Sequence, residues 1–224
     1  MAALAPARLN APPRWLKPAV HAIAALPGLW LVVAWAELLV LDPASLRLSA
    51  EPVAYTHNAL GLMALRLLVA TLAVTPVHRL TGWVPVLSLR RMLGLWAFAY
   101  ATVHLLFYLL MELDGSLALL LEEAVKRNFI FFGLATFLLM APLAATSTRA
   151  AIRRLGGRRW QALHRLAYPA ALAASIHFIL RVKGFQWEPW LYLALLLALL
   201  ALRLLPRRVR SSRGSATPAP RPSA

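Results

Sequence analysis

Residues 93–111 read LGLWAFAYATVHLLFYLLM, an apolar run close to the ~20 residues that a membrane-spanning helix needs. Residues 167–180 read AYPAALAASIHFIL and have the same character. Each run contains one histidine, His104 in the first and His177 in the second. A histidine surrounded by hydrocarbon is costly, so it normally has a partner or a function. These two runs therefore predict two membrane helices whose histidines bind one common ligand between them.

The composition supports a polytopic membrane protein, because 61% of the 224 residues are hydrophobic and only 14% are charged. Six apolar segments are long enough, or nearly so, to cross the membrane. They run over residues 20–41, 53–76, 92–111, 128–146, 161–181 and 189–205. We therefore predict an all-α fold, a polytopic membrane bundle of about six helices whose loops are too short to form a soluble catalytic domain.

The bundle divides the chain into three parts. Residues 1–18 form a polar, proline-rich cytoplasmic segment without the pattern of a cleaved signal peptide, residues 19–206 form the membrane domain, and residues 207–224 form a disordered basic cytoplasmic tail. The chain has no cysteine, which excludes disulfides, iron–sulfur clusters and thiolate-ligated heme.

The charges predict the orientation of the bundle. The N-terminal segment and every second loop, together with the tail, carry 17 of the 24 basic residues, whereas the alternate loops carry seven of the eight acids. The positive-inside rule then places both termini in the cytoplasm. We read the net charge of +16 as a topology signal and predict no nucleic-acid partner.

The two histidines lie at similar depths. At 1.5 Å of rise per residue, His104 lies ~20 Å beyond Arg91 and His177 lies ~25 Å beyond Trp160. Both depths fall in the outer half of a ~30 Å hydrocarbon core. We predict that His104 and His177 are axial ligands of one heme iron, the metal that this arrangement suits best. The alternative for either residue is a simple hydrogen bond between helices.

Other histidines are less well matched to this pair. His164 lies only ~6 Å into the fifth segment, and 13 residues of helix separate it from His177, so it belongs to an inner layer. The equivalent position on the third segment is Arg91, so that helix offers no second inner ligand. His164 is therefore either an additional heme ligand or an inner-layer residue. His57, near the outer end of the second segment, is as well suited to a heme propionate as to ligation.

Four arginines are candidates for binding an anionic part of a cofactor. Arg66 is a basic residue near the middle of the second segment, where it either pairs with a carboxylate or phosphate or snorkels toward the cytoplasm. Arg90, Arg91 and Arg149 are candidates for the phosphate of FMN. Topology and contacts with lipid headgroups are the simpler explanation for these basic residues. Nothing resembles the glycine-rich nucleotide loop G-x-G-x-x-G.

Three motifs resemble the MsrQ family, formerly called YedZ, of heme-binding membrane subunits with a ferric-reductase-like transmembrane domain. They are LRLLVATLAVTP at 65–76, RRMLGLWAFAYATVHLLFY at 90–108 and TSTRAAIRRLGGRRWQALHRLAYPAALAASIHFILRVKG at 146–184. The resemblance covers roughly residues 15–205. The family's motif histidines fall on His104, His164 and His177, and its flavin-associated arginine pair falls on Arg90 and Arg91.

The resemblance implies a multi-pass b-type cytochrome of the bacterial inner membrane that binds heme b and FMN. Electrons would come from the quinone pool through quinol, or from a cytoplasmic flavin reductase. They would pass to a periplasmic, molybdopterin-containing methionine-sulfoxide reductase subunit, which repairs oxidised periplasmic proteins. The chain would be the electron-transfer subunit of that oxidoreductase system and not its catalytic subunit.

Two other functions are compatible with the residues alone. A small membrane transporter or proton channel would use the intramembrane histidines and arginines as a relay. A noncatalytic membrane anchor would need none of them for chemistry. A heme spectrum separates both from a cytochrome.

Overall fold

A computed structural model describes residues 11–204, and these residues form helices joined by short connections. The long helices are α1 (Leu16–Ala36), α2 (Pro52–Thr81), α3 (Arg90–Glu112), α5 (Asn128–Ala145), α8 (Ala167–Arg181) and α9 (Trp187–Leu204). The shorter ones are α4 (Leu117–Lys126), α6 (Arg149–Leu155) and α7 (Gly157–Leu163). A π-helical turn, Glu37–Leu41, continues α1, and 3₁₀ turns at Val84–Leu89 and His164–Leu166 precede α3 and α8.

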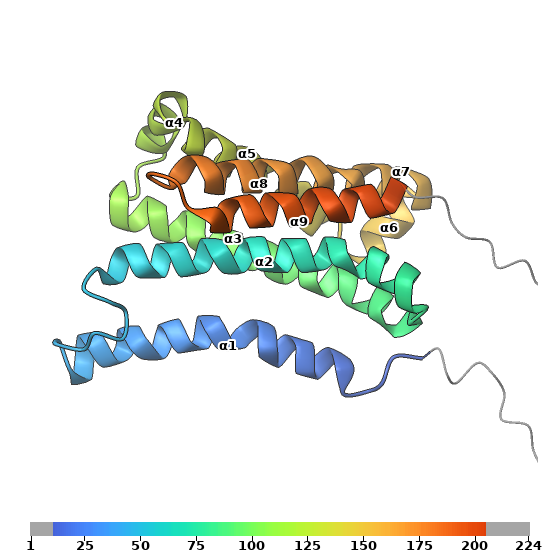
Figure 1. Cartoon of the computed structure of the whole chain (residues 1–224), viewed down its shortest axis with the longest axis horizontal. Helices are drawn as coiled ribbons and strands as arrows, with labels where there is room; N and C mark the ends of the chain where they lie inside the picture. The colour runs from blue at the N-terminus through green and yellow to red at the C-terminus, as the bar shows by residue number, and fades with distance from the viewer. Residues whose placement is uncertain (1–10, 205–224) are drawn as a thin grey trace, which may run out of the picture.

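Two helix pairs form the centre of the bundle. Helix α2 packs most extensively on α3, and α5 packs most extensively on α8, while contacts of α3 with α5 and of α2 with α8 join the pairs. Helix α9 covers α2 and α8, and α1 runs along the side of the bundle (Figure 1). Helix α4 lies at one end of the molecule, and α6 and α7 lie at the other (Figure 1).

Helix α1 is attached to α3 and α2 by specific hydrogen bonds. The Tyr100 hydroxyl of α3 donates to the Ala24 carbonyl at 2.7 Å and accepts from the Gly28 N–H at 2.9 Å. The Trp35 indole N–H donates to the Thr56 hydroxyl of α2 at 2.8 Å. Together these bonds fix the position of α1 along the bundle.

Four helical segments are long and apolar enough to cross a membrane: Leu16–Leu41, Pro52–Thr81, Val84–Glu112 and Asn128–Ala145. The chain is therefore an all-α, multi-pass membrane protein. Helices α8, with 15 residues, and α9, with 18 residues, occupy the fifth and sixth predicted segments.

The fifth segment differs from the continuous helix expected over residues 161–181. Helix α7 ends at Leu163, a 3₁₀ turn covers His164–Leu166, and α8 begins at Ala167. The cause is Pro169, which has no N–H to donate to the Arg165 carbonyl and whose ring crowds that carbonyl. The break separates His164 from the helix that carries His177.

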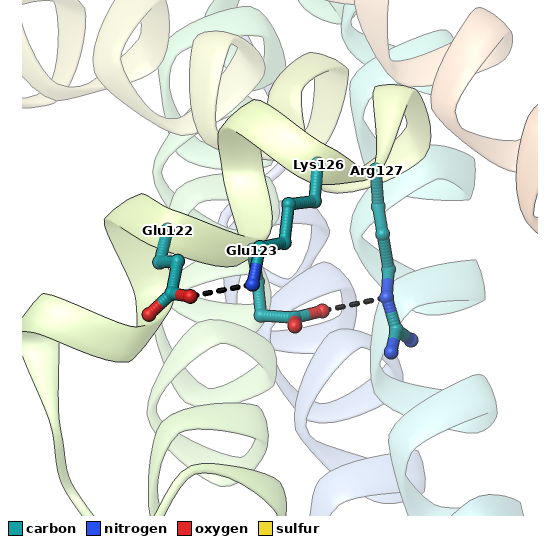
Figure 2. A network of polar contacts seen from close by, with 4 residues as sticks. All are labelled: Glu122, Glu123, Lys126 and Arg127. Carbon is teal, nitrogen blue, oxygen red and sulfur yellow. Dashed lines mark hydrogen bonds and ion pairs between the residues drawn. The ribbon is translucent and has the colours of Figure 1, made fainter.

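Helix α4 is an element that the sequence analysis assigned to a loop. The Ser116 hydroxyl caps it by accepting from the Leu119 N–H at 3.2 Å. Ion pairs between residues four apart support it, with Lys126 at 2.5 Å from Glu122 and Arg127 at 2.6 Å from Glu123 (Figure 2). Its buried residues, Leu120 and Ala124, pack with Leu113 and Ile130 and cover this end of the bundle.

The described residues, 11–204, include only part of the two predicted segments that flank the membrane domain. Helix α1 begins at Leu16, so the last three residues of the predicted N-terminal segment, 16–18, are helical. The rest of that segment up to residue 10, and the predicted tail 207–224, lie outside the described residues.

Candidate functional site

A cavity of about 1060 Å³, its open mouth included, lies between the two central helix pairs. Its wall is largely apolar, with residues such as Leu65, Leu68, Phe137, Met140 and Phe178. Its polar lining includes His57, Asn58, His104, His177 and Arg181. A large apolar cavity with a few convergent polar groups is the usual form of a cofactor site.

His104 of α3 and His177 of α8 meet inside this cavity. Their ring centroids are 6.3 Å apart, and their ring planes are nearly perpendicular at 85°. His104 Nδ1 lies 3.0 Å from the His57 carbonyl oxygen, and His177 Nδ1 lies 2.6 Å from the Phe129 carbonyl oxygen. Because a carbonyl only accepts, each Nδ1 carries the proton. Each Nε2 therefore keeps its lone pair, which is the tautomer a metal needs.

A glycine lies against each of these imidazoles. A Cβ on Gly61 would lie 2.9 Å from His104 Cε1, and a Cβ on Gly133 would lie 2.8 Å from His177 Nδ1. Each glycine follows the carbonyl that holds its histidine by four residues, as Gly61 follows His57 and Gly133 follows Phe129. The α2–α3 and α5–α8 pairs thus hold their histidines in the same way.

The spacing of the two rings suits one metal atom. Bonds from a metal to an imidazole nitrogen are about 2 Å long, and the ring centre lies about 1 Å behind the nitrogen. Two rings that face the same metal atom therefore have centroids about 6 Å apart. The observed 6.3 Å matches this separation. The residues present fit a heme with two histidine ligands.

Asn58 is exposed, and the end of the cavity beside it, which we call the mouth, contains a polar group that the sequence analysis did not predict. His57 stacks on His104 with ring centroids 4.1 Å apart, and its Nε2 is buried without a hydrogen-bond partner. Arg181 donates a hydrogen bond to the Asn58 side-chain oxygen. Arg181 follows His177 by one helical turn and shares its face, a signal that could have been read from the sequence. No such signal identifies Asn58.

His164 lies outside this cavity lining, at the other end of the bundle. Its Nδ1 lies 3.1 Å from the Trp160 carbonyl oxygen, its ring stacks on Trp160 at 3.9 Å, and its Nε2 is buried without a hydrogen-bond partner. Arg90 is in electrostatic range of both His164 and Arg203. Arg203 lies in the last turn of α9. It donates to the Tyr168 hydroxyl and the Leu72 carbonyl, each at 2.6 Å.

The other candidate arginines do not gather at one place. Arg66 faces α9, where its Nε donates to the Tyr192 hydroxyl at 2.8 Å and its Nη2 lies 3.9 Å from Glu188. Arg91 faces α1, away from Arg90, because neighbouring helix positions are about 100° apart. Arg149 is exposed at the start of α6.

Comparisons with known proteins agree with this architecture. Residues 60–175 match the family described as "Ferric reductase like transmembrane component". The heme-binding subunit MsrQ of protein-methionine-sulfoxide reductase from Xanthomonas axonopodis pv. citri is 45% identical over 90% of this chain and 93% of its own length. The subunit of the same name from Rhodospirillum rubrum is 46% identical over 74% of this chain and 81% of its own length. The chain therefore belongs to the MsrQ family of ferric-reductase-like membrane proteins.

Proposed function

We propose that this protein is the heme-binding electron-transfer subunit of a protein-methionine-sulfoxide reductase, with His104 and His177 as the axial ligands. The observation that supports this most strongly is the pair of perpendicular imidazoles, 6.3 Å apart, each with its Nδ1 on a backbone carbonyl. The names of the MsrQ relatives support heme binding and membership of a reductase with a separate catalytic subunit.

The residues of the cavity have different roles in binding the cofactor. When bound, the heme b supplies the one-electron redox chemistry, and the protein supplies position and electrostatics. His104 and His177 would together hold the heme iron, and an iron held by two imidazoles would serve electron transfer and not the binding of small molecules. The apolar wall excludes water, and the mouth residues Arg181, Asn58 and His57 bind and orient the heme carboxylates.

The proposed topology completes the bundle with α8 and α9 as the fifth and sixth spans of a bacterial inner-membrane protein. An even number of spans puts both ends of the chain on one side. The end with α6 and α7 carries arginines such as Arg153, Arg154, Arg158 and Arg159, which supports a cytoplasmic position for that end. The mouth of the cavity, near Arg181 and α4, then lies toward the periplasm, where a molybdopterin-containing catalytic subunit accepts the electron.

FMN is the second proposed cofactor, and the basic end of the bundle is its proposed site. Arg90 is in electrostatic range of His164, which stacks on Trp160. The Trp160 indole N–H donates to the Thr146 carbonyl at 2.9 Å, and Thr146 lies three residues before Arg149. This group offers the Arg90 guanidinium for a phosphate and the Trp160 and His164 rings for contact with a flavin ring. A quinol or a cytoplasmic flavin reductase is the proposed electron source on this side.

An absorption spectrum of the purified protein tests the heme. We expect a dithionite-reduced b-type spectrum after expression with sufficient heme, and loss of that spectrum in both His104→Ala and His177→Ala. His164→Ala is the matched comparison and keeps the spectrum, because His164 does not line the cavity. A colourless wild-type protein contradicts the proposal and favours a transporter or an anchor. Loss of heme only in His164→Ala shows that the ligand assignment is wrong.

A further inference from the structure

A second cleft lies on the side of the bundle between α1 and α3. It has about 870 Å³ of empty space, its open side included. The polar residues of its lining, which we call its polar rim, are Lys17, His21, Ser88 and Arg91, and the apolar residues include Leu95 and Trp96. None of these residues lines the cavity that holds the histidine pair.

The cations and the apolar residues of the cleft lie at different depths along the membrane normal. Lys17 is the second residue of α1, where one candidate membrane span begins, and Arg91 is the second residue of α3, which follows the 3₁₀ turn that opens the candidate span Val84–Glu112. His21, Leu95 and Trp96 lie about one turn deeper. The cleft therefore places positive charge at the level of lipid headgroups and apolar surface at the level of lipid chains.

The polar rim offers donors to an anion. No acidic residue lines the cleft, and within residues 11–204 the ion pairs involve neither Lys17 nor Arg91. The Trp96 indole N–H donates to His21 Nδ1 at 2.9 Å, so His21 carries its proton on Nε2 and can donate from it. Two cations and an imidazole donor on one cleft favour a negatively charged ligand there.

We propose that this cleft binds one anionic phospholipid of the surrounding membrane. Lys17 and Arg91 hold the phosphate, His21 donates to the headgroup, and an acyl chain lies along Leu95 and Trp96. Basic pockets between membrane helices at the cytoplasmic surface are known to select anionic headgroups. The lipid would join α1 to α3 at the end where the Tyr100 hydrogen bonds do not reach. This inference depends on the charge and position of the cleft and not on the electron-transfer function.

Native mass spectrometry of the purified full-length protein with added phosphatidylglycerol or phosphatidylcholine tests the proposal. We expect wild type to retain phosphatidylglycerol in preference to phosphatidylcholine. The Lys17→Gln, Arg91→Gln double variant should bind phosphatidylglycerol about tenfold more weakly or worse. Arg153→Gln with Arg154→Gln is the matched control, since it removes the same charge from the same end of the bundle and should keep the wild-type affinity.

A second variant separates loss of the site from loss of fold. Ala99→Trp fills the cleft from α3 without changing its charge, and it should also weaken phosphatidylglycerol binding. Unchanged affinity in either cleft variant overturns the proposal. Loss of bound FMN from the double variant, with lipid binding intact, also overturns it and assigns the cleft to the flavin. The heme spectrum should stay unchanged in all variants, because the cleft and the heme cavity share no residue.

Discussion

At the scale of single residues, the two glycines decide how closely the imidazoles can approach the helices beside them. His104 and His177 could be chosen from the sequence because polar residues in an apolar run are conspicuous. Gly61 and Gly133 could not be chosen in this way, because glycine is common in membrane helices. Only the three-dimensional structure reveals that each one lies under a histidine ring.

We therefore predict that Gly61→Ala and Gly133→Ala each lose at least half of the bound heme. The new Cβ would lie within 3.0 Å of the ring, closer than atoms can pack, so the imidazole must move off its carbonyl. Heme per chain, measured from the absorption spectrum, checks this. Gly94→Ala is the control, because its Cβ would meet Thr71 at an ordinary 3.6 Å. Full heme content in both cavity variants would show that the glycines do not position the ligands.

Arg181 at the mouth of the cavity leads to a prediction about the heme potential. A cation near the heme favours the reduced form, which carries one less positive charge. We expect Arg181→Ala to lower the midpoint potential by a shift of the order of 50 mV. Arg181→Lys should restore most of it. Lys183→Ala, an exposed change two residues away, is the control in a redox titration. An unchanged potential in Arg181→Ala would remove this residue from the heme environment.

At the scale of the elements, the apolar segments were predictable and the helices at their ends were not. Segment length and hydropathy located α1, α2, α3 and α5 because membrane insertion depends on those properties. The break before α8 depends on one proline, and α4 depends on a cap and ion pairs that a hydropathy profile does not register.

The ion pairs of α4 lead to a prediction about pH. The hydrogen bond and charge of Lys126 hold the pKa of the Glu122 carboxyl below its ordinary value. The support that this pair gives to α4 is therefore present above the unfolded pKa of glutamate and is lost as the pH falls through the lower folded value. In an NMR titration of the labelled carboxyl, Lys126→Ala should raise the Glu122 pKa, whereas Lys183→Ala should not. An unchanged Glu122 pKa in the Lys126→Ala variant would contradict the ion pair between these two residues.

At the scale of the whole molecule, two similar helix pairs face one another across the proposed heme cavity. Each pair contributes one histidine, one backbone carbonyl and one glycine, so the site exists only when the pairs are assembled. Depth along the helices could be predicted from residue counts, which is why His104 and His177 could be matched. The contact of the Arg91 face with α1 could not be predicted, because it depends on which helices pack around α3.

Electron paramagnetic resonance of the oxidised, purified protein tests the central claim most directly. Two imidazoles in nearly perpendicular planes on one iron give a low-spin ferric signal of strong anisotropy, since neither ring plane dominates the field of the iron. We expect this signal in the wild type, and its loss in His104→Ala and in His177→Ala. A high-spin ferric signal in the wild type, or a low-spin signal that survives both substitutions, would contradict the account.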